Sequence, residues 1–260
     1  MAIATYENFV IEKKMTDLVN TKANINALFT VDNSLALEAG LKQIVNKYTY
    51  TGKVEKLAKG AKNTTKGSVA LVPTEYVVER YQQTFTYNDQ DIMQDPYVLD
   101  VMTTGASEVM ANDIREKYFA ELAKITNEYE YDTFNYDTVV DALAQIGREV
   151  ESDMFLVMGL DLKAAIRKDA DYKASKMGEI LYTGQFGDIC GVPCVCSKLV
   201  PAGEAYITAK DQIKHLVKKD GSVEQDRDIE TKDNTVVYER HGLMALVDET
   251  KSIKLKKKTA

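Results

Sequence analysis

The sequence has few of the features that mark a membrane or secreted protein. No apolar run approaches the roughly 20 residues that a membrane-spanning helix needs, and the longest, 154–158, is far shorter. The first residues lack the basic region and the apolar stretch of a secretory signal. Only three cysteines occur, and without such a signal we expect free thiols in a reducing compartment. These absences predict a protein that is made in a cytoplasm and stays there.

Catalytic motifs are also scarce. His215 and His241 are the only histidines, so base-assisted nucleophilic catalysis has few possible centres, and no Gly-x-Ser-x-Gly elbow is present. Segment 60–67 has the outline of a phosphate-binding loop, but Thr65 stands where the second glycine is required. The three aspartates of 89–95 could hold a cation, yet carboxylates there are also typical of a helix N-terminus, and the calcium-loop pattern is absent. We therefore expect no enzyme, no cofactor and no metal site.

The three cysteines are the best remaining candidates for chemistry. Cys190, Cys194 and Cys196 have three residues and then one residue between them, which is not a zinc-knuckle pattern. Cys194 and Cys196 would share one face of a strand, where cysteine often acts as a small hydrophobic residue. Core packing is the favoured interpretation, and a metal or redox site is the alternative.

The composition is that of a folded protein with an uneven distribution of charge. Hydrophobic residues make up 45% and charged residues 28% of 260 positions, enough for one large domain or two moderate ones. The net charge is -7, but residues 1–66 carry +4 (10 Lys against 6 acids), residues 251–260 carry +5, and residues 67–250 carry -16 (18 basic against 34 acidic). Basic ends on an acidic body indicate segments that bind nucleic acid or the acidic body of another copy. Plain solvation of lysine-rich segments is the alternative.

The N-terminal third reads as an arm followed by a hairpin. Residues 1–31 show no sustained hydrophobic period and are expected to be an extended arm. Residues 35–45 are expected to form a short helix, capped by 32–34. Segments 48–51 and 76–87 read as strands, the second rich in aromatic and β-branched residues.

Between these strands lies a basic segment, residues 52–67. It has five lysines against the single acid Glu55, and almost no large aliphatic residue except Leu57. Because it cannot bury enough apolar area to pack on its own core, we expect a long hairpin whose tip projects from the body and needs a partner. The candidate contact residues are Lys53, Lys56, Lys59, Lys62 and Lys66.

The clearest single element follows the hairpin. Asp95 and Pro96 read as an N-cap and a first helical residue. Apolar or small residues then recur at steps of three or four, which predicts one amphipathic helix of about thirty residues, some 45 Å long. The stripe comprises Val98, Met102, Ala106, Val109 or Met110, Ile114, Tyr118, Leu122 and Ile125.

Beyond residue 129, helical and strand patterns alternate, and no internal repeat is found. The expected elements are helices over 136–146 and 160–168, a buried strand over 154–158, and strands over 192–196, 205–207, 236–238, 243–247 and around 253–255. Together with the earlier elements they predict an α+β fold.

The order of these elements resembles the major capsid proteins of tailed bacteriophages, which have the Hong Kong 97 phage fold. In that family an N-terminal arm leads to a two-stranded extended loop, a peripheral domain with a long spine helix, and an α/β axial domain. The chain then returns to the peripheral domain. Two stretches carry the local resemblance: 91–95 at the entry to the spine helix, and 187–207, with its Gly-x-Pro strand, turn and strand.

The resemblance implies a division of the chain into five segments. These are an arm at 1–46, an extended loop at 47–90, a peripheral domain with the spine helix at 91–129, an axial domain at 130–222, and returning strands with a C-terminal tail at 223–260. Because the family's extended loop lies across an adjacent subunit, the basic tip is expected to contact another copy through complementary charge.

The resemblance also implies the function and the partners. The chain would self-assemble through pentamers and hexamers into an icosahedral capsid shell around a double-stranded DNA phage genome, in the host bacterial cytoplasm. A portal is implied, and no membrane partner is. Some members carry an N-terminal scaffolding segment that a protease removes; the short arm here favours a separate scaffold protein, and prior removal of such a segment is the alternative. The covalent Lys–Asn crosslinks of some members are not expected, because 236–247 contains no asparagine.

Two other interpretations stay open. An encapsulin-like nanocompartment shell would have the same fold but enclose cargo enzymes in place of a genome. A small α/β enzyme, with the three cysteines or His215 at its site, is the alternative of a different class.

Overall fold

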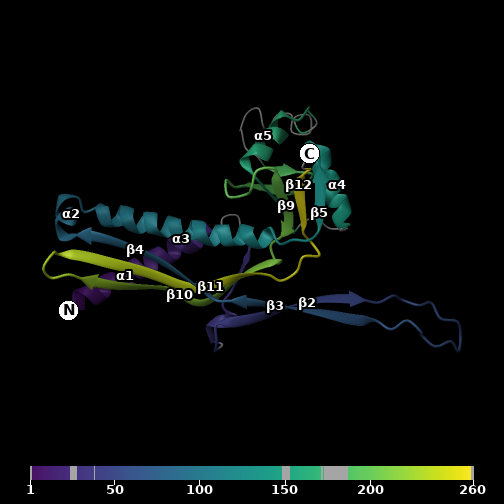
Figure 1. Ribbon diagram of the computed structural model, residues 1–260, viewed down its shortest axis with the longest axis horizontal. Coiled ribbons are helices and arrows are strands. Elements are labelled where there is room, and N and C mark those ends of the chain that lie inside the picture. Colours follow the sequence, from purple (N-terminus) through teal and green to yellow (C-terminus); the bar gives the residue numbers. More distant parts are fainter. Residues whose placement is uncertain are drawn as a thin grey trace.

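The computed structural model describes residues 2–23, 28–37, 39–147, 153–170, 172 and 187–258, with side chains from Phe9 onward. The described elements form three parts (Figure 1). A four-stranded sheet is covered by two long helices, a six-stranded sheet carries two shorter helices, and a two-stranded hairpin extends away from both. No described helix is both long and apolar enough to span a membrane.

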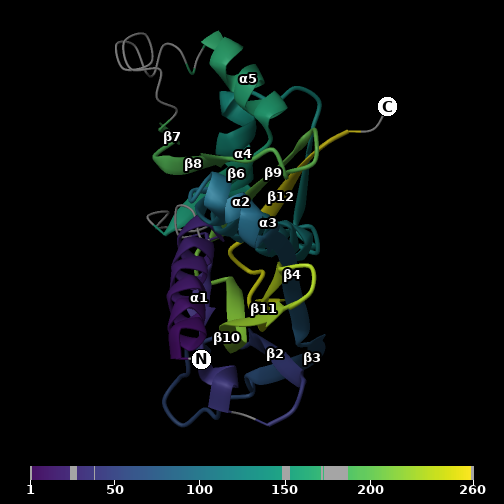
Figure 2. The same cartoon turned by 90° about the vertical axis from the view of Figure 1, so that its left-hand side faces the viewer.

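The four-stranded sheet and its two helices form the elongated part of the molecule. The sheet order is β1 (Thr30–Asp32), β10 (Ile213–Arg227), β11 (Asp233–Leu246) and β4 (Glu79–Asn88). Only the pairing of β1 with β10 is parallel. The helices α1 (Ala2–Ala23) and α3 (Val98–Leu122) contact each other along the sheet, with α1 and β4 on opposite sides of α3 (Figure 2).

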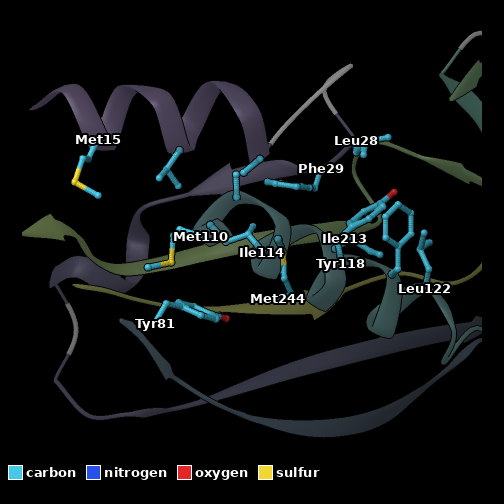
Figure 3. Close-up of a cluster of buried hydrophobic side chains, with 14 of the residues drawn as sticks. Met15, Leu28, Phe29, Tyr81, Met110, Ile114, Tyr118, Leu122, Ile213 and Met244 are labelled. Atoms are coloured by element: carbon cyan, nitrogen blue, oxygen red, sulfur yellow. The ribbon is translucent and has the colours of Figure 1, made fainter. Parts of the chain in front are cut away.

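The core of this part lies between α3, α1 and the inner face of the sheet. Met110, Ile114, Tyr118 and Leu122 project from α3 toward Met15 of α1 and toward residues of β10, β11 and β4 (Figure 3). Each such side chain contributes roughly 1.5–3 kcal/mol when fully buried. The apolar stripe predicted for this helix is therefore confirmed, and Met110, not the exposed Val109, is the inward residue.

The predicted extended arm over 1–31 is wrong, because residues 2–23 form the helix α1. Its buried residues Ile11, Met15, Val19 and Ala23 recur every four positions. Because about one residue per turn is buried, the sequence of this helix has no broad apolar face, and its helical period is too weak to predict a helix. Residues 1, 24–27 and 38 of the expected arm lie outside the described residues.

The helix predicted over 35–45 is also wrong. A short 3-10 helix, η2 (Ser34–Leu37), is followed by Gly40 with φ of +104° and then by the strand β2 (Lys42–Thr51). Glycine alone adopts such a φ at little cost, so the chain can turn there from one element to the next. The predicted cap is present, because a carboxylate oxygen of Asp32 accepts a hydrogen bond from the Ser34 N–H at 2.9 Å.

The long helix is shorter than predicted. It has 25 residues, about 37 Å at roughly 1.5 Å per residue, and begins at Val98. A separate short helix, α2 (Asp89–Gln94), precedes it and has a capping box formed by Asn88 and Asp91.

Asp95 caps the turn between the helices by accepting a hydrogen bond from the Tyr97 N–H at 2.9 Å. The predicted N-cap at Asp95 with Pro96 as the first helical residue is therefore wrong, because Tyr97 is the N-cap of α3 and its side chain makes no capping hydrogen bond. Asp91 belongs to the capping box of α2, whereas Asp89 accepts hydrogen bonds from Asn234 and Arg227.

The six-stranded sheet rises beside the C-terminal end of α3 (Figure 1). Its order is β5 (Glu128–Tyr131), β12 (Ile253–Lys257), β9 (Glu204–Ala209), β6 (Met154–Met158), β8 (Val192–Cys196) and β7 (Asp188–Ile189). The helices α4 (Tyr136–Ile146) and α5 (Leu160–Lys168) share a core with β6 residues Leu156 and Met158, while Phe155 and Val157 face the core around α3. Both helices and the strands β6 and β8 have the predicted bounds.

The returning strands differ in extent from those predicted. The segments 236–238 and 243–246 belong to one continuous strand, β11, which ends one residue before the predicted bound of 247, and its partner β10 was not predicted. The β10 sequence is interrupted by Lys218, Lys219, Asp220 and Gly221, where the register shifts against β11. Irregular pairing removes the strict alternation by which a strand is recognised.

Candidate assembly surface

The hairpin is the part of the molecule that its own body covers least. The strands β2 and β3 (Ser68–Val77) pair antiparallel from Lys42 opposite Val77 to Thr51 opposite Ser68. Among the described strands, neither pairs with any other. The hairpin prediction is thus confirmed, but the returning strand is 68–77, and most of the predicted strand 76–87 is β4, separated from β3 at Val78.

One face of the hairpin carries an exposed row of apolar side chains. Tyr48 lies opposite Leu71 and Tyr50 opposite Val69, and Ile44 shares their face. These five side chains are between 52% and 70% exposed. A two-stranded sheet with no cover is marginally stable in water, so this apolar row indicates a surface that another molecule covers.

The opposite face is anchored at its base. Val45 and Tyr76 pack against a small core of Leu35, Val78, Leu216, Leu243 and Ala245. The Tyr76 hydroxyl accepts a hydrogen bond from the Leu246 N–H at 3.3 Å. The hairpin therefore joins the outer face of the four-stranded sheet through its first few residue pairs only.

A polar contact ties the same base to the end of α3. The Lys47 ammonium donates to Glu249 at 2.7 Å, and the Thr126 hydroxyl donates to the other oxygen of Glu249 at 3.0 Å. Burial alone would raise the pKa of Glu249, but these hydrogen bonds outweigh it and lower the pKa. The carboxylate thus stays charged and holds the hairpin to the body.

The tip has no regular structure but is folded locally. Glu55 accepts hydrogen bonds from the Thr64 N–H at 2.9 Å and the Thr64 hydroxyl at 3.2 Å, which lowers the pKa of Glu55. The Tyr50 ring lies over Gly52 and Gly67, where a Cβ on either glycine would overlap it. A larger residue at either position would displace the exposed Tyr50 ring from this place.

The candidate contact lysines all lie on this tip. Lys53, Lys56, Lys59, Lys62 and Lys66 are exposed, and none has a carboxylate within 4 Å among the described residues. With Glu55, residues 52–67 have a net charge of +4. The structure brings the five lysines together on one projecting segment, and what they contact in an assembly stays a prediction.

The apolar row on the hairpin is a feature that the sequence interpretation missed. Its signal is present as alternation, with Tyr48 and Tyr50 in one strand and Val69 and Leu71 in the other. It was not predicted because residues 68–75 were not recognised as the strand that pairs with 42–51. Val54 is a second omission, because it is a large aliphatic residue at the tip and is fully exposed.

The cysteines lie at a distance from the hairpin, on the six-stranded sheet. Cys190, Cys194 and Cys196 pack, partly buried, against the core shared with α4 and α5. Burial raises the pKa of the Cys194 thiol to about 12 and raises that of Cys196, which disfavours the reactive thiolate. Within the described part of the chain, no group of three or more His, Cys, Asp or Glu side chains could hold a metal ion.

His215 is buried, and its ring lines the bottom of a cavity of about 230 Å³ together with Asp220 and Arg240. It is buried on β10 with its ring edge-on to Phe29, the ring centroids 5.7 Å apart. Burial, with a smaller contribution from the positive charge of Arg240, lowers the pKa of His215 to about 3. At neutral pH it is an uncharged core residue.

Comparison with known proteins places these features in one family. The family model described as phage capsid protein matches residues 71–255 of the chain. The major capsid protein of Staphylococcus phage phiMR11 is 23% identical over 258 residues, which cover 95% of this chain and 92% of that protein.

Solved structures show the same fold at low sequence identity. The capsid structure of the cyanophage P-SCSP1u aligns with a TM-score of 0.72 at 11% identity, over 90% of this chain and 87% of that chain. The virus-like particle from Pyrococcus furiosus aligns with a TM-score of 0.66 at 13% identity, over 96% of this chain and 99% of that chain. Each alignment covers nine-tenths or more of this chain.

Proposed function

The chain belongs to the phage capsid protein family, and we propose that copies of it close into an icosahedral shell around a double-stranded DNA genome by laying their hairpins across one another. It is a major capsid protein, and its role is to form the capsid shell. The observation that carries the rest of the proposal is the hairpin, which has an apolar row, five unpaired lysines and a base anchored to the body.

The physical argument concerns apolar and charged side chains of the hairpin that have no partner in the single chain. The row formed by Tyr48, Tyr50, Val69, Leu71 and Ile44 is open to water in the single chain. Covering it with a second copy would remove apolar area from water at about 25 cal/mol per Å². The +4 charge of the tip would meet the -16 of residues 67–250 in that copy, which fixes orientation and speeds association. Repetition of this head-to-tail contact around an axis generates rings, and rings of different size close a shell.

The division into domains is also part of the proposal, with bounds that differ from those expected. β4 (Glu79–Asn88) and the start of β10, from Ile213, lie in the four-stranded sheet, and β12 (Ile253–Lys257) lies in the six-stranded sheet. The part built on α3 and the four-stranded sheet would be the peripheral domain, and the six-stranded sheet with α4 and α5 the axial domain. The helix α1 replaces the extended arm expected at the N-terminus. Pentamers and hexamers, a separate scaffold protein, a portal, packaged DNA and assembly in the host cytoplasm are further parts of the proposal.

A purely structural role is preferred to the two alternatives. Both the family model and the Staphylococcus phage protein are described as capsid proteins, which favours a virion over an encapsulin-like compartment. The enzyme alternative relied on the cysteines or His215, and the raised thiol pKa values and the core position of the histidine argue against either as a reactive group.

Charge reversal at the tip tests the proposal. In the variant with Lys53, Lys56, Lys59 and Lys62 changed to Glu, circular dichroism and subunit stability should be nearly unchanged, because these side chains touch no core. Closed particles, counted by electron microscopy, should be lost. The matched variant with the same four residues changed to Arg keeps the charge and should assemble. Normal shells from the Glu variant would contradict the proposed role of the tip.

A further inference from the structure

A cavity of about 230 Å³ lies between the C-terminal end of α1, the strand β1 and the longer strands β10 and β11. The polar residues that line it are Asn20, Asn33, His215, Asp220 and Arg240. None of them belongs to the hairpin. A polar cavity of this size has room for a small solute as well as for water.

Two nitrogen atoms of buried side chains at this cavity have no hydrogen-bond partner in the described part of the chain. They are Nε2 of His215 and Nε of Arg240, and each of these residues is only 2% exposed. No side chain of the neighbouring strand stands against the imidazole, because residue 242 is a glycine and a Cβ there would lie 3.1 Å from Nε2. Buried polar atoms are normally paired, so two unpaired nitrogens at one cavity indicate a partner from outside the chain.

The positive charge of Arg240 is only partly neutralised within the chain. Its guanidinium donates to the amide oxygen of Asn20 at 2.8 Å, but that amide carries no charge. Its ion-pair partner is Asp220, at 3.5 Å, and the side chain of Asp220 is 58% exposed. The charge of Arg240 also contributes to the lowered pKa of His215, so it acts inside the cavity. A buried guanidinium with so weak a partner favours an anion from solution.

Most of the polar groups at the cavity are hydrogen-bond donors. The guanidinium of Arg240 only donates, and a neutral imidazole donates from the nitrogen that carries its proton. The oxygen of Asn20 is occupied by Arg240, which leaves its amide NH₂ group to donate, and Asn33 adds a second amide. Several donors around one guanidinium suit the oxygen atoms of an oxyanion.

Asp220 is the exception, and it limits which oxyanion fits. One of its carboxylate oxygens accepts a hydrogen bond from the Gly221 N–H at 3.0 Å and is also the oxygen nearest to Arg240. The other oxygen has no partner among the described residues. A carboxylate only accepts hydrogen bonds, so an oxyanion beside it must bring a proton of its own. At neutral pH every phosphate ion carries at least one O–H group, whereas sulfate and acetate carry none.

We propose that this cavity binds one hydrogen phosphate ion per chain, with Arg240 and His215 donating to its oxygens and Asp220 accepting its proton. The phosphodiester groups of a nucleic acid have no such proton, so the ligand is free phosphate. The ion would contact α1 through Asn20 and the sheet through β10 and β11, and would therefore hold α1 on the sheet. Because the site lies within one chain, this inference does not depend on the proposed contact between copies.

Isothermal titration calorimetry of full-length, unassembled subunits tests the proposal. Phosphate, sulfate and acetate are titrated separately at neutral pH and equal ionic strength, into a buffer that contains none of them. Phosphate should bind at one site per chain, and sulfate and acetate at least about tenfold more weakly, because Asp220 would meet them with like charge and no hydrogen bond. Equal binding of sulfate would overturn the proposal. Absence of phosphate binding would also overturn it and would mean that water alone occupies the cavity.

Matched variants assign the binding to this cavity. Asp220→Asn replaces the acceptor with a group that also donates, and the preference for phosphate over sulfate should disappear. The control is Asp226→Asn, because Asp226 lies on the same strand and likewise accepts the next N–H, at 2.9 Å, but does not line the cavity. Arg240→Met should abolish the binding of both ions, and if that variant does not fold, the two aspartate variants decide. An unchanged preference in Asp220→Asn, or the same loss in Asp226→Asn, would contradict the site.

Discussion

The apolar residues of the hairpin and those of the helix α3 are covered in opposite ways. Along α3, Met110 and Tyr118 are 3% and 0% exposed, because α1 and the four-stranded sheet pack on them. Along the hairpin, Tyr48 and Leu71 are 67% and 52% exposed. The apolar residues of the helix are thus covered by their own chain, whereas those of the hairpin are exposed to solvent in the single chain.

This difference predicts that residues of the body determine subunit stability, whereas residues of the outer hairpin determine assembly into shells. The body can reach its native state without the hairpin's apolar face, which contributes nothing to the body's core. The hairpin is held only at its base, through Tyr76, Lys47 and Glu249. Changes in the body should therefore be measured as loss of subunit stability, and changes in the outer hairpin as loss of shells.

The largest effect is expected from placing one charge in each region. Met110→Asp buries an unpaired carboxylate and should destabilise the subunit by more than about 4 kcal/mol, preventing soluble folding. Leu71→Asp, on the exposed row, should change the free energy of unfolding by about 1 kcal/mol at most, yet abolish closed particles. Urea titration and electron microscopy measure the two outcomes. A similar loss of stability in both variants would mean that the hairpin is part of the folding unit.

Acid should weaken the body through one buried histidine. The folded-state pKa of His215 is lowered to about 3, whereas an unfolded chain titrates near 6.5. Between these values the unfolded chain binds a proton that the folded chain excludes, so stability is intact above pH 6.5 and falls as the pH drops. The loss should approach about 1.4 kcal/mol per pH unit.

The window from pH 6.5 to 5 isolates this effect, since most carboxylates titrate lower. Urea titration of unassembled subunits at several pH values should show the slope in the wild type. His215→Leu removes the titrating group, and its stability should be nearly flat over the same window. An equal slope in both proteins would show that His215 is not the group responsible.

A smaller effect should distinguish an ion pair between the hairpin and the body from an ion pair within the hairpin. Glu249 joins β2 to the body through Lys47, whereas Glu75 pairs with Lys42 within the exposed hairpin. Glu249→Gln should lower the free energy of unfolding by about 1 kcal/mol, and Glu75→Gln by less than about 0.5 kcal/mol. Thermal unfolding of unassembled subunits measures the difference. If the order were reversed, the anchor would lie elsewhere.

Sequence patterns predicted the elements whose burial is regular. The sequence predicts the correct bounds for the helices 136–146 and 160–168 and for the strand 154–158. In each, the spacing of apolar residues and the flanking polar or glycine residues indicate the same start and end. The inward face of α3 was predicted for the same reason. The element order then supported the capsid resemblance, which the family match confirms.

Elements that depend on distant partners were missed. The helix α1 is defined by a stripe of single residues that fit α3, and β10 by a long irregular pairing with β11. Neither partner is visible in the local sequence. For the assembly surface, the lysines 53–66 could be predicted from their lack of apolar neighbours. The anchor of the hairpin could not, because Lys47, Thr126 and Glu249 come from separate parts of the chain that only the fold brings together.

The dependence of shell closure on salt tests most directly the claim that the basic tip contacts another copy. The screening length falls from about 10 Å at 0.1 M to about 3 Å at 1 M ionic strength, so exposed charge pairs weaken while apolar burial does not. Light scattering on freshly refolded subunits should show slower closure at 1 M than at 0.1 M sodium chloride, and mature shells should persist at both. Closure at equal or greater speed in 1 M salt would contradict the account, since the basic tip would then face solvent or the packaged genome instead of a neighbouring subunit.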